Sequence, residues 1–182
     1  MRIKHDAYYT PTRLAKVLVN LLPIVEGARV LEPSLGQGAF ADAIRLYTKD
    51  VYGVDIERNV LGEARCKYFA QADFLSDEHF LPSNSSEPTF DWIIGNPPFS
   101  HAEEHLRHAC KHSKNVAFLM RLAILESAKR IPLWKEVRLK KVWVLVQRPS
   151  FTDGKTDSCA YGFFWCQQGW EYLPELDWVS WK

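Results

Sequence analysis

The chain has 182 residues, of which 47% are apolar, 13% aromatic and 25% charged. This length and this apolar content fit one domain with a sizeable core, so we expect a single domain over residues 1–182. The net charge of +1 neither requires nor excludes nucleic acid as a partner.

The sequence also argues against a membrane-spanning segment, disulfide bridges and a zinc site. No run of about 18 apolar residues is present and no signal peptide precedes Thr10, so we expect a soluble, intracellular protein without a membrane partner. The four cysteines show no paired CxxC spacing. This spacing favours reduced thiols over disulfide bridges or a zinc site.

The first predicted element is a helix that follows Tyr8-Tyr9-Thr10-Pro11. An apolar stripe supports the helix, and its members are Leu14, Val17, Leu18 and Leu21. Thr10 as the N-cap and Pro11 at the first helical position form a good start signal. A capped helix without further function is the simplest interpretation of this segment.

A strand over Ala28 to Leu31 leads into a glycine loop, Glu32-Pro33-Ser34-Leu35-Gly36-Gln37-Gly38. Glycines allow the backbone to approach a ligand closely at a helix N-terminus. Asp55 follows Gly36 by nineteen positions and ends a second strand, Val51 to Val54. An acid at about this spacing binds ribose hydroxyls. The third glycine of the dinucleotide fingerprint is missing, which favours a nucleoside such as S-adenosylmethionine over NAD; a βαβ turn without a ligand is the alternative.

The next two predicted strands end at polar or aromatic residues. Cys66 to Ala70 forms a third strand, and Asp73-Phe74 follows it, where a helix cap beside a core Phe is the plain interpretation. A loop over residues 81–89 then leads into an apolar strand, Phe90 to Gly95. Asn96-Pro97-Pro98-Phe99 lies at the carboxyl end of this strand, the edge of an open α/β sheet where ligands bind.

The chemistry of Asn96-Pro97-Pro98-Phe99 suits an aromatic amine. The prolines stiffen Asn96 and fix the Pro97 carbonyl, so two oxygen acceptors can hold one NH2 group beside the flat face of Phe99. An exocyclic amine is a poor nucleophile because its lone pair is conjugated into the ring. Two acceptors would free that lone pair by positioning and electrostatics, without a strong base. The alternative is a turn that only ends the strand.

This tetrad resembles the catalytic motif of methyltransferases that use S-adenosylmethionine to methylate N6 of adenine. The order of Thr10-Pro11, the glycine loop and the tetrad is similar to the gamma class of N6-adenine DNA methyltransferases. Arg148-Pro149-Ser150-Phe151, followed by Lys155-Thr156-Asp157-Ser158, looks most like the small enzymes of bacteriophages and related bacterial elements. The resemblance covers roughly residues 8–165. It implies an α/β, Rossmann-like class I methyltransferase fold in a bacterial or phage-infected cytoplasm, with a seven-stranded, mostly parallel sheet and a C-terminal antiparallel hairpin strand.

The resemblance also implies roles for single residues. Asn96, Pro97 and Phe99 would be catalytic, while Phe99 and Phe151 would stack on a base flipped out of the duplex. Thr10 would lie against the methionine end of the cofactor, with Asp73 and Phe74 on its adenine. The expected cofactor-binding residues are Thr10, Glu32, Pro33, Ser34, Gly36, Gly38, Asp55, Ile56, Asp73, Phe74 and Asn96.

The later part of the chain completes the predicted sheet. Asn115 to Met120, Lys141 to Gln147 and Tyr161 to Cys166 are the fifth, sixth and seventh strands. The aromatic tail, residues 169–182, is expected to pack over the sheet edge, and stacking on unpaired bases is the alternative.

Histidines and basic residues in this part invite metal and phosphate hypotheses. His101, His105, His108 and His112 share one helix face, but methyl transfer needs no metal and an apolar stripe adjoins them, so we expect no metal. The basic residues between 129 and 141 are either a solvated surface or a contact with phosphates. Lys129, Arg130 and Lys155 are the candidates for contact with a nucleic-acid backbone.

Several alternatives stay open. Many gamma enzymes carry a separate target-recognition domain and this chain ends at Lys182, so specificity would come from short loops, a partner protein or a homo-oligomer. DNA is the expected substrate, although the same motif serves RNA. Protein-glutamine methyltransferases typically have Tyr after Asn-Pro-Pro, so Phe99 favours a base. A catalytically silent subunit that binds cofactor or a partner is the remaining alternative, and the intact tetrad argues against it.

Overall fold

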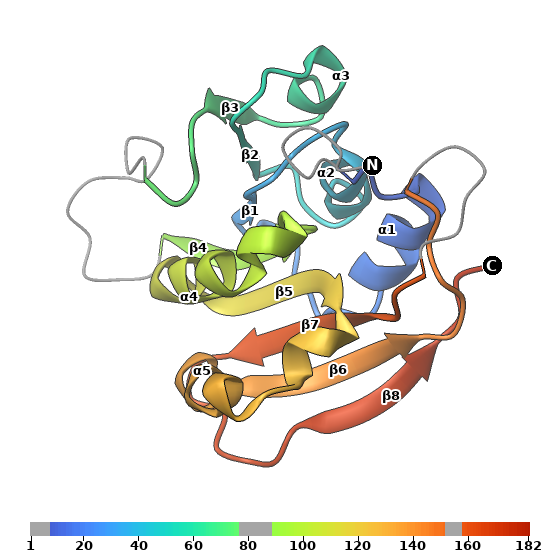
Figure 1. Cartoon of the computed structure of the whole chain (residues 1–182). Coiled ribbons are helices and arrows are strands. Elements are labelled where there is room, and N and C mark those ends of the chain that lie inside the picture. Colours follow the sequence, from blue (N-terminus) through green and yellow to red (C-terminus); the bar gives the residue numbers. More distant parts are fainter. Residues whose placement is uncertain (1–7, 77–88, 152–157) are drawn as a thin grey trace.

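Apolar strands alternate with helices along most of the chain, and this pattern folds into one mixed sheet flanked by helices (Figure 1). The computed structural model describes residues 8–76, 89–151 and 158–182. The strands are β1 (Val30–Glu32), β2 (Val51–Asp55), β3 (Tyr68–Gln71), β4 (Phe90–Gly95), β5 (Ser113–Arg121), β6 (Leu139–Leu145), β7 (Tyr161–Gln167) and β8 (Glu175–Val179).

The helices are short. The α-helices are α1 (Thr12–Val19), α2 (Ala39–Ile44), α3 (Val60–Glu63), α4 (Ala102–His112) and α5 (Ile131–Val137). Among the described residues, 3-10 helices accompany them at η2 (Phe99–His101), η3 (Leu122–Leu125) and η4 (Ala128–Arg130). None of the helices in the three described ranges has the length and apolar character that crossing a bilayer requires.

The sheet has the strand order β3-β2-β1-β4-β5-β7-β6-β8. β1 pairs in parallel with β2 on one side and with β4 on the other, and β3 and β5 extend the parallel part at each end. The strand order therefore reverses between β1 and β4. In open α/β sheets such a reversal leaves a crevice at the carboxyl ends of the two strands, and this crevice is where ligands bind.

The predicted antiparallel strand near the C-terminus is confirmed. β7 lies between β5 and β6 and runs antiparallel to both. All its residues from Tyr161 to Cys166 are buried, which explains why this segment is a continuous apolar run instead of an alternating one. The register places Tyr161 opposite Arg121, at the carboxyl end of β5.

The prediction of seven strands is wrong, because the described residues form eight. Instead of only packing over the sheet edge, the tail adds β8 to it, parallel to β6. Lys141 on β6 supports this pairing, since its Nζ lies 3.4 Å from a carboxylate oxygen of Glu175 and 3.6 Å from one of Asp177. Beyond β8, the Trp181 indole N–H donates a hydrogen bond to the carbonyl of Gln147 (2.9 Å) and its ring joins the core.

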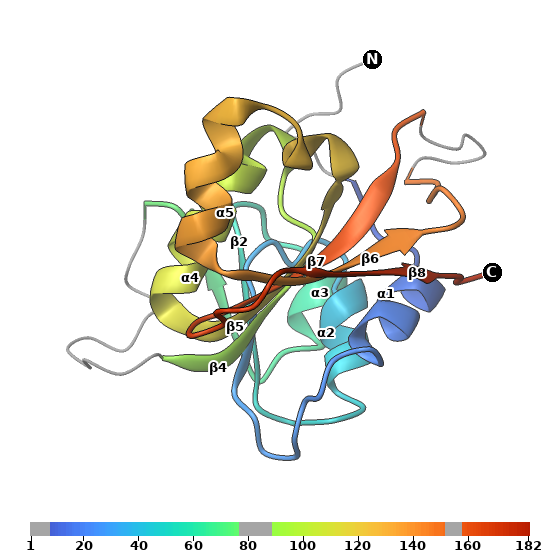
Figure 2. The ribbon, with the colours of Figure 1, turned by 90° about the horizontal axis from the view of Figure 1, so that it is seen from below.

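Helices cover the sheet on two faces, as Figure 2 shows with the sheet seen edge-on. α1 and α2 lie on one face, where Leu18 and Phe40 join a buried cluster with Leu119 of β5. α4 and α5 lie on the other face, where Leu106 and Leu133 join a second cluster. Because both faces of the central strands are covered, the sheet is held rigidly and its carboxyl edge can position side chains.

The start of α1 differs from the prediction. Pro11 is the N-cap and the helix begins at Thr12, with no side-chain capping hydrogen bond. Thr10 is therefore not the N-cap. Its hydroxyl instead accepts a hydrogen bond from Asn96 Nδ2 (3.1 Å), and Asn96 is the residue that follows β4.

We expect the attachment of the tail to contribute measurably to stability. Trp181→Ala should lower the free energy of unfolding by about 3 kcal/mol, because it opens a cavity in the core and removes the hydrogen bond to Gln147. Leu173→Ala is the matched control, since this side chain is 88% exposed. Urea unfolding of both variants measures the difference. Equal stability of the two variants would contradict the placement of the tail.

Candidate functional site

A cleft of about 930 Å³ opens at the carboxyl ends of the parallel strands. Its walls come from the segments that follow β1, β2, β3 and β4, together with Arg121 at the end of β5. The cleft therefore lies at the predicted edge of the sheet, where the strand order reverses.

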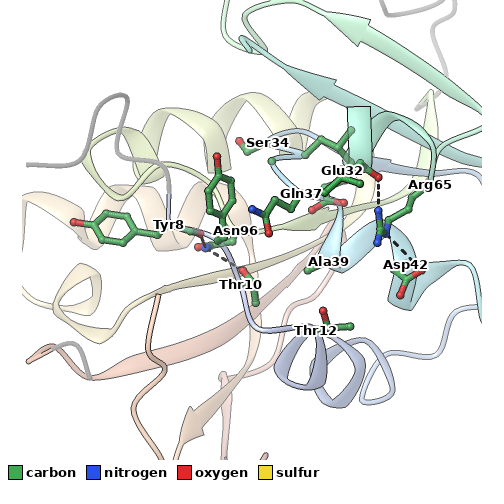
Figure 3. Close-up of a pocket in the computed structure, with 14 residues that line it drawn as sticks. Tyr8, Thr10, Thr12, Glu32, Ser34, Gln37, Ala39, Asp42, Arg65 and Asn96 are labelled. Carbon is green, nitrogen blue, oxygen red and sulfur yellow. Dashed lines mark hydrogen bonds and ion pairs between the residues drawn. The ribbon is translucent and has the colours of Figure 1, made fainter. Parts of the chain in front are cut away.

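A smaller cavity of about 110 Å³ adjoins this cleft (Figure 3). The two spaces share Tyr8, Tyr9, Ser34, Gly36 and Asn96. Figure 3 draws the side chains of Gln37 and Asn96 in the middle of the view and those of Arg65 and Asp42 at the right, where Arg65 Nε lies 3.7 Å from a carboxylate oxygen of Asp42.

Most of the predicted site residues meet at these two spaces. The large cleft is lined by Pro33, Ser34, Gly36, Asp55, Ile56, Asp73, Phe74, Asn96 and Phe99. Thr10 and Glu32 line the small cavity. Gly38 and Pro97 do not line either space, and Pro97 is buried. Phe151 also lines neither space, and its ring centroid lies 5.8 Å from that of Phe99.

Asp55 fixes the glycine loop. One carboxylate oxygen of Asp55 accepts a hydrogen bond from the Gly36 backbone N–H (2.7 Å), and the other accepts from the Glu57 backbone N–H (2.9 Å). Gly36 has φ +49° and Gly38 has φ +75°, in the region that favours glycine. Gly38 is the N-cap of α2. Its left-handed backbone thus turns the loop into the helix, and this is its structural role.

Glu32 is a buried carboxylate at the end of β1, only 2% exposed. Its Oε2 accepts a hydrogen bond from the backbone N–H of Ala41 in α2 (2.7 Å). Burial raises the pKa of Glu32 well above its usual value, and the nearby Asp55 carboxylate adds to this rise, while the hydrogen bond from Ala41 opposes it. Glu32 is thus a poorly solvated anion site that a cationic ligand group would stabilise.

The Asn96 side chain has a defined orientation. Its Nδ2 donates to the Tyr8 carbonyl (3.0 Å) and to the Thr10 hydroxyl (3.1 Å). A backbone carbonyl can only accept, so the nitrogen must face Tyr8 and the oxygen must face away. That oxygen, Asn96 Oδ1, is buried and has no hydrogen-bond partner in the described structure. A buried acceptor without a partner costs stability and is expected where a ligand supplies the donor.

Four aromatic rings, from Tyr8, Phe99, Phe151 and Tyr161, form a cluster beside Asn96, called the aromatic cluster below. The Phe99 ring lies 5.0 Å from the Tyr8 ring and 5.3 Å from the Tyr161 ring. The Phe99 and Phe151 rings meet at 63°, close to edge-on. Two rings in this arrangement leave no room for a third between them. The predicted sandwich of a base between Phe99 and Phe151 therefore requires a ring to move.

Phe74 packs against the histidines of α4. Its ring lies 5.5 Å from that of His105 and 4.8 Å from that of His108. Desolvation lowers the pKa of His105, so the neutral imidazole is favoured beside Phe74. Within the described residues no group of three or more His, Cys, Asp or Glu side chains could hold a metal ion.

The structure places differently the three residues that are predicted to contact a nucleic-acid backbone. Lys155 falls outside the described residues. Lys129 is exposed in η4 and lines neither space. The Arg130 guanidinium makes hydrogen bonds to the protein backbone, since its Nη1 donates to the carbonyls of Ala123 (3.1 Å) and Glu126 (3.2 Å). A role of these residues in phosphate binding stays a prediction.

Sequence patterns assign no role to two residues of the site, Arg65, which forms a wall of the small cavity, and Arg121, which lies over the Phe99 ring. The resemblance places the turn from Tyr8 to Pro11 at the methionine end of the cofactor, and the structure adds that the Tyr8 carbonyl orients Asn96. A signal existed for Arg121, since it ends the predicted fifth strand, at the edge of the sheet where Asn96 ends the fourth. No local pattern marks Arg65, because α3 is only four residues long.

Sequence comparison finds methyltransferases and methylase subunits. The type II methyltransferase M.HincII of Haemophilus influenzae is 29% identical over 99 residues, covering 54% of this chain and 18% of the relative. The type II methyltransferase M.TthHB8I of Thermus thermophilus is 36% identical over 93 residues, 50% of this chain and 20% of the relative. The type I restriction enzyme MjaIX methylase subunit of Methanocaldococcus jannaschii is 26% identical over 108 residues, which cover 53% of this chain and 19% of the relative. The chain thus spans a fifth or less of these relatives, and no protein-family model matches it.

Structural comparison covers nearly the whole chain. The type I restriction enzyme EcoKI M protein superposes with a TM-score of 0.67 at 14% identity, over 89% of this chain and 44% of that chain. A protein of Listeria monocytogenes, described as a candidate class I S-adenosylmethionine-dependent methyltransferase, has a TM-score of 0.64 at 11% identity, over 98% and 67%. The fold is that of the class I methyltransferases. At these identities the likeness extends to the fold and no further.

The contact between α3 and the glycine loop should be intolerant of a methyl group. A Cβ built on Gly62 would lie 2.4 Å from the Gly36 carbonyl oxygen, so the loop backbone must shift. We expect Gly62→Ala to destabilise the domain by about 1–3 kcal/mol. Ala64→Ser, at an exposed position just after α3, should have little effect. Thermal unfolding of both variants measures this, and an unchanged Gly62→Ala midpoint would contradict the close approach.

Glu32 should make stability depend on pH in a defined direction. A carboxyl group with a raised folded-state pKa adds no cost while protonated, below its ordinary value of 4.5. As the pH rises through the raised folded pKa, the buried charge increasingly costs stability. We therefore expect the thermal unfolding midpoint of Glu32→Gln, minus the midpoint of the parent protein at the same pH, to increase from pH 4 to pH 8. Glu26→Gln, at an exposed position, is the control; a constant difference for Glu32→Gln would contradict the buried charge.

Proposed function

We propose that this domain transfers a methyl group from S-adenosylmethionine to the exocyclic N6 amine of adenine in DNA. The observation that carries the proposal is Asn96, whose buried Oδ1 lacks a partner while its Nδ2 is fixed by Tyr8 and Thr10. A fixed acceptor of this kind suits an N–H donor that arrives with the substrate. The class I methyltransferase fold and the relatives named as methyltransferases support the same reaction class.

The residues of the two spaces fit the cofactor. Asp55 and Asp73, which line the large cleft, would accept hydrogen bonds from its ribose and adenine. Glu32, the buried carboxyl group that lines the small cavity together with Thr10, would face the cationic methionine end, whose charge would favour the ionised form of Glu32. The left-handed glycine loop would let the backbone approach the ligand closely. When bound, S-adenosylmethionine supplies an electrophilic methyl group on a sulfonium.

The catalytic role of the tetrad follows from its acceptors. Asn96 Oδ1 would accept one N–H of the adenine amine. The Pro97 carbonyl would accept the other, and because Pro97 is buried and lines neither space, this contact requires the carbonyl to become accessible when the base binds. Both N–H bonds would then be engaged, which favours a pyramidal nitrogen with its lone pair free to attack. Phe99 would hold the base by stacking, which typically contributes about 1–3 kcal/mol for each base. The contribution of the protein is positioning and electrostatics, and it needs no strong base.

DNA is the proposed substrate because relatives of this chain are named as a type II methyltransferase and as the methylase subunit of a type I restriction enzyme. The large cleft is open enough for a base that has been flipped out of a duplex. The chain spans a fifth or less of those relatives. We propose that the choice of target sequence involves a partner protein or a second copy of the chain, and a similar solved structure described in terms of complex assembly of the type I R-M system supports a partner.

The proposal is tested by following the methyl group. Radiolabelled S-adenosylmethionine is incubated with the protein and unmethylated plasmid DNA, RNA or a protein extract, and the labelled nucleosides are separated by chromatography. We expect label in N6-methyladenine from DNA. Label in N4-methylcytosine, in RNA alone or in protein would replace the proposed substrate, and no transfer to any of these would favour a silent subunit.

Asn96→Ala should reduce turnover by about 100-fold or more, by analogy with the loss of one preorganised electrostatic contact. The matched control is Asn20→Ala, an exposed residue whose side chain accepts a hydrogen bond from Tyr47. Single-turnover assays give the rate, and calorimetry gives the cofactor affinity. Parental turnover in Asn96→Ala would refute the assigned role of the amide.

A further inference from the structure

Arg121 stands where the candidate base site meets the antiparallel part of the sheet. It ends β5, which pairs with β4 on one side and with β7 on the other. On β7 its register partner is Tyr161. Its side chain lines the same cleft as Asn96 and Phe99.

The Arg121 guanidinium contacts three rings of the aromatic cluster. Its Nε donates a hydrogen bond to the Tyr161 hydroxyl (3.3 Å). Its Cζ lies 4.7 Å from the Phe99 ring centroid, over the ring, and 6.0 Å from the Tyr8 centroid. Tyr161 is only 1% exposed, so its hydroxyl is a fixed anchor. A planar, permanently charged guanidinium is suited to stack on a ring and donate a hydrogen bond at the same time.

The prolines do not by themselves set the Phe99 ring. Pro97 and Pro98 restrict the backbone before Phe99, but the rotation of the Phe99 side chain is free of that restriction. Stacking in a productive orientation requires the ring plane to be held, because small misplacements of a reacting group lower the rate strongly. Arg121 supplies a contact on the ring face and is itself anchored at a second point, on Tyr161.

We propose that Arg121 is a positioning residue for the target base: its guanidinium, anchored on the Tyr161 hydroxyl, holds the Phe99 ring in the plane against which the base stacks. This inference rests on the proposed function of the Asn96 site. It also implies that the base uses the part of the Phe99 ring that the guanidinium leaves open.

A phosphate contact would need different chemistry from the same side chain. A point charge serves a phosphate, so Lys could replace Arg there, whereas Lys lacks the planar fork that stacks on Phe99 and reaches Tyr161. Loss of a phosphate contact also changes the salt dependence of DNA binding by about one unit of slope. Loss of a ring-positioning contact leaves that slope unchanged.

The test compares Arg121→Met, Arg121→Lys, Tyr161→Phe and the double variant Arg121→Met with Tyr161→Phe. Arg107→Met is the matched control, because it removes a half-buried arginine that pairs with Glu103 and Glu136 on the far helices. We expect kcat/KM for DNA to fall about 3- to 30-fold in Arg121→Met, the range of a partly desolvated cation–π contact. Cofactor affinity should be unchanged and Arg121→Lys should not restore the rate. In Tyr161→Phe, kcat/KM for DNA should fall less than in Arg121→Met. In the double variant it should be little lower than in Arg121→Met alone.

Four outcomes would overturn the inference. Recovery by Arg121→Lys, or a salt slope reduced by about one, would indicate a phosphate contact. Equal behaviour of Arg121→Met and Arg107→Met would remove any special role. A fully additive double variant would break the link to Tyr161.

An independent readout separates this inference from the proposed function. In protein with labelled Phe rings, the Phe99 ring signal should shift or broaden in Arg121→Met and stay unchanged in Arg107→Met. If the parent protein transfers no methyl group, the proposed function fails, while the Phe99 signal still decides whether Arg121 holds the ring. Tyr161→Phe keeps this test valid if Arg121→Met does not fold.

Discussion

The two hydrogen bonds donated by Asn96 are the constraint on which the rest of the site depends. They join the end of β4 to Tyr8 and Thr10, which lie 88 and 86 positions earlier in the chain. The segment before α1 is thereby drawn across the carboxyl edge of the sheet, where it forms a wall of both the cleft and the smaller cavity. The same bonds turn the buried amide oxygen away from Tyr8 and Thr10, and the Tyr8 ring lies against Phe99. One side chain thus determines the orientation of the acceptor and the shape of the space in front of it.

The glycine loop depends on a second set of contacts, made by buried charge and close backbone packing. Glu32 ties β1 to α2 through the Ala41 N–H, and Gly62 brings α3 against the Gly36 carbonyl. These contacts fix the loop between β1, α2 and α3. The cost is a carboxylate in a desolvated position, whose pKa is raised well above the usual value. A residue that lowers stability is typically retained where it binds a ligand, and here it lies beside Thr10 in the small cavity.

Local patterns sufficed for the parallel part of the fold. The apolar run of Phe90 to Gly95 predicts β4 with the bounds that the structure has, because the strand is buried and bounded by a proline turn. The glycine loop and Asp55 could be placed for the same reason. β8 could not be predicted as a strand, since Leu176 and Trp178 are largely exposed and the pairing with β6 rests on Lys141. The local pattern assigns Thr10 to a helix cap, whereas in the structure the Thr10 hydroxyl accepts a hydrogen bond from Asn96, 86 positions away. A contact across such a separation leaves no periodic trace in the sequence.

The position of Asp55 has a consequence for how binding defects are interpreted. Its carboxylate supports the Gly36 and Glu57 amides, so it braces the loop from beneath in addition to any contact with a ribose. Neutralising this residue would let the loop relax at the same time as it removed an acceptor. Weak nucleoside binding by an Asp55 variant would then reflect a change in the shape of the glycine loop as much as the loss of a contact with the ligand. The two effects separate only when the shape of the loop is observed directly, as by amide exchange at Gly36.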